Sequence, residues 1–368
     1  MDDTPTHTIE KRFPCGQCGA AVEFSPGAQM LKCPFCGHEN AVPQEPTAVE
    51  EQDFRATLDE MSGQDDHQDN LDVKCGACGA EVHGLGSRTA LSCPYCNSNI
   101  VATAKSRRLI KPRALLPFRV TREQAERAFS DWLGGLWFAP STLKRSAMSE
   151  GRLGGMYMPA WTFDCDATTS YTGMRGDAYY VSVPHTVMVN GRPQVRMRQE
   201  RRIRWSPAAG TVFNRFDDVL VLASRSLPSE HARALEPWDL KALVPYSDDY
   251  LSGFAAESYQ VDLPQGFEEA RGEMRTVIEG TVRASIGGDE QRITSMNTRH
   301  DHITYKHILL PAWISAYRFK GKVFRFMVNA RTGEVRGERP WSVPKIAAAV
   351  ALGLLVVGII VAVAVLNR

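Results

Sequence analysis

The residues best suited to chemistry are cysteines that recur in two identical frames. Eight of the nine cysteines form four Cys-x-x-Cys pairs, and each frame joins two pairs across fourteen residues. A Cys-x-x-Cys turn directs two thiolates at one point, so two turns joined by a hairpin make a tetrahedral zinc site with Zn–S distances of about 2.3 Å. Because no position is left for water, two structural zinc ions are expected. Their ligands are Cys15, Cys18, Cys33, Cys36, Cys75, Cys78, Cys93 and Cys96.

Other cysteine chemistry fits the sequence less well. The polar, acidic N-terminus contains no secretory signal, so the thiols are expected in a reducing cytosol rather than in disulfides. A thioredoxin-like motif needs a single pair, whereas these pairs come in matched twos. Four thiolates would also accept iron, so the metal itself stays open. Cys165 stands alone and is expected to be a small buried side chain.

The charge of the cysteine segments favours a protein partner. The whole chain carries a formal net charge of +1, so no global field attracts an anion. Residues 1–42, the first ribbon, have a net charge of −2, and residues 73–105, the second ribbon, have +2. Neither contains the clustered Lys and Arg that neutralise phosphates, which disfavours nucleic acid.

Between the ribbons, residues 43–72 contain ten acidic residues and one basic residue. Such a segment repels itself and is predicted to be a flexible acidic linker. Phe54, Leu58 and Met61 recur at helical spacing within it. They predict a short amphipathic helix that is either a docking element or transient.

The C-terminus predicts a membrane anchor. Twenty-one residues without charge, 346–366, span about 31 Å at 1.5 Å per residue, which matches the hydrocarbon core of a bilayer. Arg336, Arg339 and Lys345 precede this run, so the positive-inside rule places the N-terminal body in the cytoplasm. Residues 345–368 are therefore expected to be a transmembrane tail anchor, and the bilayer a partner.

The body is expected to be α+β with mostly antiparallel sheet, in halves 106–257 and 258–344. Thr121 and Gln124 form a capping box before a helix that ends at Gly134. The stretch "YQVDL" (259–263) is predicted to be a strand before a second helix, and "KVFRFMVNARTGEVRG" a hairpin. Pro-Ala-Trp occurs once in each half, at 159–161 and 311–313. These shared pieces predict an internal duplication.

The body offers little catalytic chemistry. It contains no phosphate-binding P-loop, no G-x-S-x-G and no H-E-x-x-H motif, so an enzyme is not expected. His300 and His302 would share a strand face and with His307 could bind a metal, although a solvated face is the simpler interpretation. Five arginines between Arg196 and Arg204 could meet anionic lipid or nucleic acid. A charged sheet face is again the simpler interpretation.

The paired ribbons, "GMYMPAWTFD", "KHILLPAWISAYRFKGKVFRFMVNARTGEVRGERPWSVPKI" and the closing apolar run resemble a bacterial family of membrane-anchored double zinc-ribbon proteins. Its members are often labelled transcription-factor-IIB-type zinc-ribbon proteins, or similar to the primosomal replication-factor-Y helicase. The absence of a Walker loop argues against a helicase here. The resemblance implies the eight zinc ligands given above and no catalytic residue.

The resemblance also implies a cellular setting. Relatives are associated with SPFH-domain and phage-shock-type proteins that respond to envelope stress. The expected function is a non-enzymatic adaptor in the bacterial inner membrane whose ribbons recruit cytosolic proteins. The alternative is a membrane-tethered nucleic-acid-binding protein. The partner and the oligomeric state, a homo-oligomer included, are left open by the sequence.

Overall fold

The chain is described here from a computed structural model. The described residues are 14–42, 49–63, 68–75, 81–83, 90–93, 99–101, 104–140, 142–143, 153–189, 192–226, 235–319 and 322–366.

The fold is mixed α+β, with four helices and a large, mainly antiparallel sheet in the described part of the chain. The helices are α1 (Phe54–Gly63), α2 (Arg122–Gly135), α5 (Leu263–Ile286) and α6 (Val343–Leu366). The strands are β1 (Glu23–Ser25), β2 (Met30–Lys32), β3 (Glu39–Asn40), β4 (Gln52–Asp53), β5 (Gln68–Lys74), β6 (Glu81–His83), β7 (Ala90–Ser92), β8 (Asn99–Val101), β9 (Ala104–Leu109), β10 (Ala114–Leu115), β11 (Gly154–Val189), β12 (Arg192–Leu222), β13 (Val244–Pro245), β14 (Ala255–Glu257), β15 (Glu290–Phe319), β16 (Lys322–Asn329) and β17 (Val335–Gly337).

Two strand–helix–hairpin units exchange their first strands. One unit is β10–α2–β11–β12 and the other is β14–α5–β15–β16, and β11 lies antiparallel to β15 at the centre of the sheet. β10 pairs in parallel with β15 of the other unit, and β14 pairs in parallel with β11. Each central strand then pairs with its own hairpin partner. Neither unit completes its sheet alone.

The exchange is symmetric about the pair Met158 and Leu310. β12 joins β11 from Ala160 onward, and β16 joins β15 from Ala312 onward, so each hairpin begins at the alanine of a Pro-Ala-Trp triplet. The proline carbonyls behave alike: Ala223 N–H donates to Pro159 and Ala330 N–H donates to Pro311. This symmetry is the one that an internal duplication predicts.

The two triplet tryptophans cross between the units. The Trp161 indole N–H donates to the carbonyl of Val261 at 2.9 Å, and the Trp313 indole N–H donates to the carbonyl of Val120 at 2.9 Å. Each acceptor immediately precedes the residue that caps the other unit's helix. At Gly266, an added Cβ would lie 2.7 Å from Trp161 Cδ1, so glycine is needed where α5 crosses this ring.

Local signals predicted several elements correctly. Thr121 and Gln124 form the reciprocal capping box of α2, and β16 and β17 form the hairpin with its turn at Gly333. The prediction of a strand at 259–263 is wrong, because the N–H groups of Gln260 and Val261 donate to the Ala223 carbonyl instead of to a neighbouring strand. The strand of this region, β14, ends just before that stretch.

The expected flexible linker is also wrong for residues 49–63, which dock on the body. β4 pairs with β15, and Phe54 at the start of α1 packs against Phe163 and Phe267, with ring centroids 6.3 and 4.9 Å away. Leu58 joins the same core. The apolar face of α1 therefore outweighs the charge repulsion of its segment.

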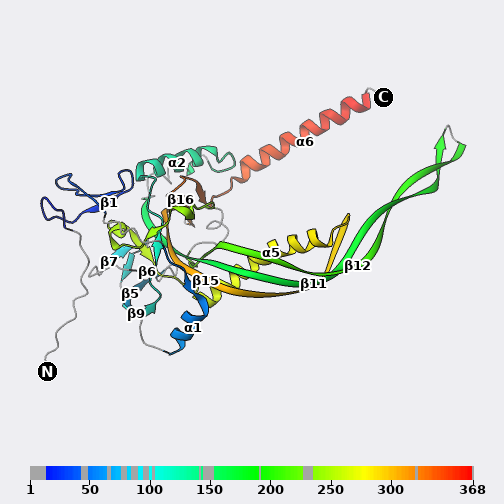
Figure 1. The fold of residues 1–368 in the computed structure, drawn as a ribbon. Coiled ribbons are helices and arrows are strands. Elements are labelled where there is room, and N and C mark those ends of the chain that lie inside the picture. Colours follow the sequence, from blue (N-terminus) through cyan, green and yellow to red (C-terminus); the bar gives the residue numbers. More distant parts are fainter. Residues whose placement is uncertain are drawn as a thin grey trace.

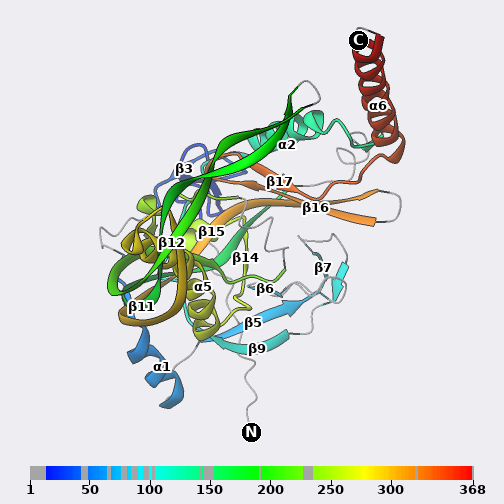
Figure 2. The same ribbon diagram turned by 90° about the vertical axis from the view of Figure 1, so that its right-hand side faces the viewer.

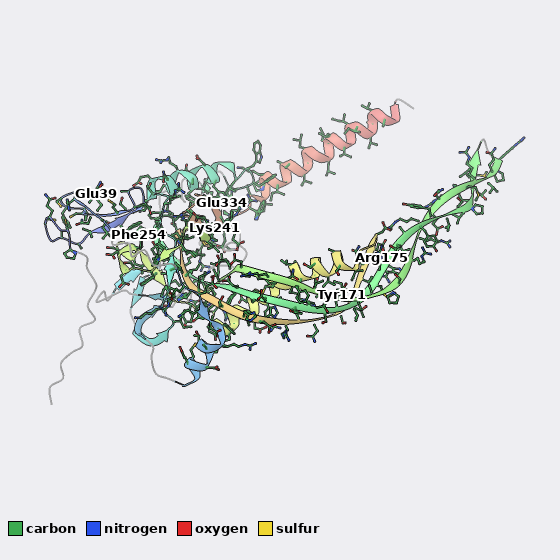
Figure 3. The ribbon with its side chains drawn as sticks, in the orientation of Figure 1. Glu39, Tyr171, Arg175, Lys241, Phe254 and Glu334 are labelled. Atoms are coloured by element: carbon green, nitrogen blue, oxygen red, sulfur yellow. The ribbon has the colours of Figure 1, made fainter. Side chains whose placement is uncertain are left out.

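The pairing of β11 with β15 ends at Gly176 and Glu290, the first residue of β15. Beyond that pair, β11 and β12 continue as a two-stranded arm. Thirteen residues of β11 make an arm of about 40 Å. Figures 1 and 2 show it projecting from the body as a twisted ribbon, and Figure 3 places Tyr171 and Arg175 along the strand that leads into it. α5 covers the base of the arm, where the Tyr171 hydroxyl meets Ser285 Oγ at 2.8 Å.

The apolar C-terminal run forms the single helix α6. Its 22 residues Val343–Ala364 are long and apolar enough to cross a membrane, and none of this length is buried against the described body. Figure 1 shows α6 leaving the body near the end of α2.

We predict that the crossed tryptophans support stability equally. Trp161→Phe and Trp313→Phe each leave an inward carbonyl without its donor, which should cost about 1–3 kcal/mol and lower the melting temperature by several degrees. Thermal unfolding of the full chain in detergent, followed by near-UV circular dichroism, measures this. Trp137→Phe is the control, because that ring is 81% exposed. Equal melting temperatures for all three variants would contradict the prediction.

Candidate metal centre

The first cysteine frame folds as two matching turns joined by β1 and β2. Each turn is closed by two backbone hydrogen bonds, one from the first cysteine and one from the glycine after the second cysteine. Cys15 N–H donates to the Ala20 carbonyl at 2.7 Å, and Gly19 N–H donates to the Cys15 carbonyl at 2.9 Å. The second turn repeats this pattern at Cys33 and Gly37. Both glycines have φ of +73°, a conformation that other residues rarely adopt. Both turns therefore require glycine at the residue after the second cysteine.

The four sulfur atoms of this frame converge. Cys15 Sγ lies 3.6 Å from Cys36 Sγ, and Cys18 Sγ lies 3.5 Å from Cys33 Sγ. All four ligand atoms lie within 4.8 Å of one another. Tetrahedral coordination at about 2.3 Å places neighbouring sulfurs about 3.8 Å apart, so the residues fit one metal ion. Among the described residues, no second group of His, Cys, Asp or Glu converges in this way.

The electrostatics of the cluster favour a cation at its centre. Burial raises the pKa of Cys15. Hydrogen bonds from the backbone amides of Gln17 and Cys18 and from the neighbouring thiols outweigh this effect and lower the pKa to about 6. The His38 amide lowers the pKa of Cys36, but burial and the neighbouring thiols raise it to about 12. The neighbouring thiols thus stabilise a thiolate at Cys15 but oppose the ionisation of Cys36. A dication would supply the opposite charge that stabilises all four thiolates.

The ribbon that carries the four-cysteine cluster packs against the body. Phe24 of β1 lies on Tyr250, with ring centroids 5.2 Å apart, and its N–H donates to the Ser252 carbonyl at 3.0 Å. Gln29 Nε2 donates to the Phe118 carbonyl at 2.6 Å. Cys15 and Cys33 belong to the same buried cluster as these aromatic residues. The ribbon therefore has a fixed orientation.

Among residues 14–42, the described part of the ribbon, one large apolar side chain is exposed. Phe35, between the cysteines of the second turn, is 80% exposed, beside the exposed Cys36. Sequence reasoning missed Phe35, although the signal was present: when both cysteines of a turn point to one metal, the two residues between them face outward. An exposed aromatic ring on a rigid turn is a typical anchor for a protein partner.

The second frame is only partly described. Cys75 and Cys93 are both buried in one cluster, whereas Cys78 and Cys96 lie outside the described residues. The flanking strands do not form a separate domain: β5 pairs with β6 and β9, and β6 pairs with β14 of the large sheet. The structure thus describes one four-cysteine cluster, and the second ion stays a prediction.

The three histidines do not share a site. The bulge between Asp164 and Asp166 gives His302 a φ of +52°, which breaks the strand alternation that would place it beside His300. His302 is exposed and its Nδ1 lies 3.1 Å from Asp166. His307 is buried against Trp161, and burial lowers its pKa to about 4. The alternative of a metal site formed by these three histidines is therefore not supported among the described residues.

A buried lysine at the same bulge holds the docked linker. Lys306 Nζ lies 2.7 Å from Asp218, 3.1 Å from Glu51 and 3.6 Å from Asp164. Burial and the hydrogen bond with Glu51 raise the pKa of Asp164 to about 6. The same hydrogen bond, together with hydrogen bonds from Thr304 and Lys306, lowers the pKa of Glu51 to about 2. No local pattern could have shown this, because Glu51 and Lys306 are far apart in the chain.

The arginine-rich stretch lies on the arm. Cross-strand pairing alternates its side chains between two faces. One face carries Arg192, Arg196, Arg198, Arg202 and Arg204, together with Glu200 and Asp177. The other carries Arg201, which pairs with Glu290 at 2.7 Å, and the apolar residues Tyr180, Met188, Val195 and Met197, each more than 60% exposed. The sequence predicted a charged face but not an exposed arm.

Cys165 is buried as expected. Its Sγ lies 3.6 Å from Met274 Sδ, and burial raises the pKa of the thiol to about 11.

Comparison with known proteins adds one relative of uncharacterised role. The chain is 25% identical over 354 residues to the uncharacterised protein YdjG of Bacillus subtilis (strain 168), an alignment that covers 91% of this chain and 92% of YdjG. No family model matches the sequence. No solved structure matches it either.

We predict that Cys33→Ser removes about one metal ion per chain, because a four-thiolate site loses a ligand at its buried side. Elemental analysis by mass spectrometry of the purified full chain measures the ion and identifies it. Cys165→Ser is the matched control, since Cys165 is a buried cysteine outside the cluster. Unchanged metal content in Cys33→Ser would refute the site. Cys75→Ser tests for the predicted second ion in the same way.

Proposed function

We propose that this protein is a non-enzymatic adaptor, anchored by α6 in the bacterial inner membrane, that captures a cytosolic protein through its metal-binding ribbon. The observation that carries the proposal is Phe35, a largely exposed ring on a turn of the four-cysteine cluster. The ribbon that contains this turn packs on the body. A preformed turn loses little conformational entropy when it binds, so one aromatic anchor can supply much of the affinity.

The membrane part of the proposal rests on charge and length. α6 is long enough to span a bilayer, and Arg336, Arg339 and Lys345 precede its apolar run. By the positive-inside rule these cations keep the body in the cytoplasm. The partner class comes from the family resemblance: an SPFH-domain or phage-shock-type protein acting in envelope stress or membrane maintenance.

Two finer features complete the proposal. Zinc is the metal favoured for an all-thiolate structural site, and Cys75, Cys78, Cys93 and Cys96 are proposed to hold a second ion. We also infer that the body arose by duplication of one strand–helix–hairpin unit. The matched strand exchange and the crossed tryptophans support this inference.

We predict that Phe35→Ala weakens partner capture at least about tenfold, as loss of an aromatic anchor does, while the metal content stays unchanged. Full-length protein in detergent would be used to capture the purified SPFH-domain protein of the same genome, with binding measured by biolayer interferometry. Lys32→Ala, on the neighbouring strand, is the control. Binding that is unaffected by Phe35→Ala would refute this docking mode, and no binding by wild type would refute this partner class.

A second candidate function follows from the arm. Its five-arginine face is long, exposed and rigidly paired, which suits a polyanion such as nucleic acid. The ribbons do not share this charge, so the arm would be the binding surface.

For this candidate we predict that Arg196→Gln with Arg198→Gln reduces the salt dependence of oligonucleotide binding by about 0.7–0.9 in logarithmic slope for each arginine removed. Fluorescence anisotropy of a labelled oligonucleotide with the full chain in detergent measures the slope. Arg201→Gln, on the opposite face, should leave it unchanged. Absence of binding at low salt, or an equal effect of Arg201→Gln, would exclude the arm as a nucleic-acid site.

A further inference from the structure

The loop after α2 is fastened to the base of α6. Lys345 Nζ, in the first turn of α6, donates to the carbonyls of Ala139 and Trp137 at 2.8 and 3.3 Å. Ser342 N–H donates to the Phe138 carbonyl at 2.8 Å. Three hydrogen bonds thus hold residues 137–139 at the point where the apolar run begins.

Two tryptophans at this junction are exposed. Trp137 is 81% exposed and Trp341 is 56% exposed, and the Arg339 guanidinium lies 4.4 Å from the centre of the Trp341 ring. In a water-facing junction these rings would leave a large apolar surface in solvent. Tryptophan and arginine next to an apolar span are instead the residues that favour the headgroup region of a bilayer.

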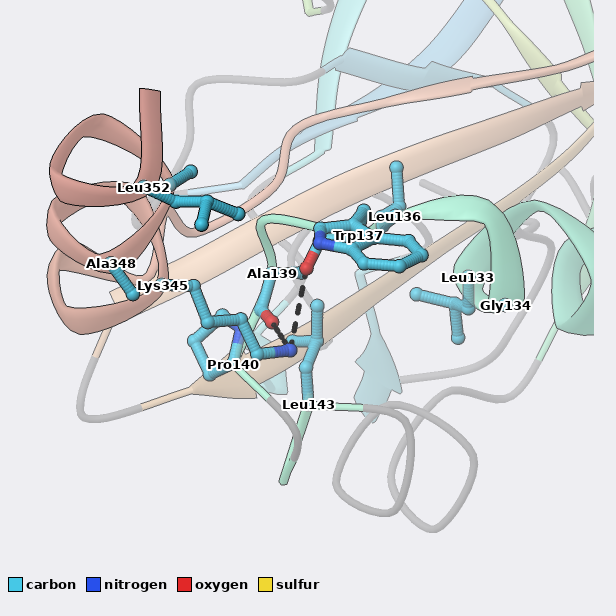
Figure 4. Close-up of a pocket in the computed structure, with 11 residues that line it drawn as sticks. Leu133, Gly134, Leu136, Trp137, Ala139, Pro140, Leu143, Lys345, Ala348 and Leu352 are labelled. Carbon is cyan, nitrogen blue, oxygen red and sulfur yellow. Dashed lines mark hydrogen bonds between the residues drawn. The ribbon is translucent and has the colours of Figure 1, made fainter. Parts of the chain in front are cut away.

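An apolar groove of about 750 Å³ lies between this loop and α6. Figure 4 shows Leu136, Trp137 and Leu143 on one side, and Ala348 and Leu352 of α6 on the other. Leu352 lies about 9 Å along the apolar run from its first residue, at 1.5 Å per residue. One wall of the groove therefore belongs to the segment that would lie in hydrocarbon.

We propose that residues 136–140 and Leu143 of the loop after α2, together with Trp341, form a membrane seat: a second, non-spanning contact that lies in the headgroup region, with lipid acyl chains in the groove. This proposal rests on the proposed function, because it requires α6 to span the bilayer. It goes further in placing part of the body in the membrane interface. The occupant is bilayer lipid because the groove is continuous with the span and its rim carries Trp137 and Lys345.

The seat predicts where tryptophan fluorescence is quenched. α6 contains no tryptophan, so quenching by lipid acyl chains can come only from the body. The full chain would be reconstituted in phosphatidylcholine/phosphatidylglycerol vesicles, with or without bromine at carbons 6 and 7 of the acyl chains. Wild type should be quenched, and Trp137→Phe with Trp341→Phe should reduce the quenched intensity at least about twofold. Trp238→Phe, which removes a buried ring, should leave the quenched intensity unchanged.

Carbonate extraction distinguishes the proposed membrane anchor α6 from the proposed membrane seat. Protein that stays in the vesicles but shows equal quenching in wild type and the double variant would overturn the seat and leave the anchor standing. Protein that carbonate removes would overturn both. Retention together with reduced quenching supports the seat.

Discussion

Two indole hydrogen bonds that cross between the halves hold the rest of the structure in place. Trp161 and Trp313 each donate to the backbone just before the other unit's helix. Because β10 and β14 also lie beside the opposite central strand, the units can close their sheet only together. The start of each helix is thereby fixed against the sheet centre. From there α5 covers the base of the arm, and α2 runs from the ribbon to the loop that Lys345 holds.

Features that depend on neighbours in the chain could be predicted, and features that depend on distant contacts could not. The Thr121 capping box and the β16–β17 hairpin rest on residues within a few positions of each other. The ligands of the first cysteine cluster likewise come from two short turns. By contrast, the docked linker depends on Lys306, and the missing strand at 259–263 depends on the Ala223 carbonyl. The residues of the charged linker do not indicate that Glu51 pairs with the buried Lys306.

The docked ribbon changes what kind of adaptor the proposed function implies. A ribbon on a flexible acidic tether would act through effective concentration, with reach set by linker length. Phe24 on Tyr250 and Gln29 on the Phe118 carbonyl remove that freedom. Reach is lost, but the binding turn is held in one orientation, so little entropy remains to be lost on capture. Specificity then depends on geometry as well as on contact chemistry.

α2 links the two surfaces that the proposals use. Its first residues lie by the ribbon, where a Cβ at Gly27 would touch Thr121 at 3.4 Å, and its last turn leads into the loop held by Lys345. Fourteen residues of helix span about 21 Å, so the four-cysteine ribbon stands about one short helix away from the proposed membrane seat. A partner that itself lies on the membrane surface would meet Phe35 without crossing the cytosol. Such a partner fits this distance better than a large, freely diffusing complex.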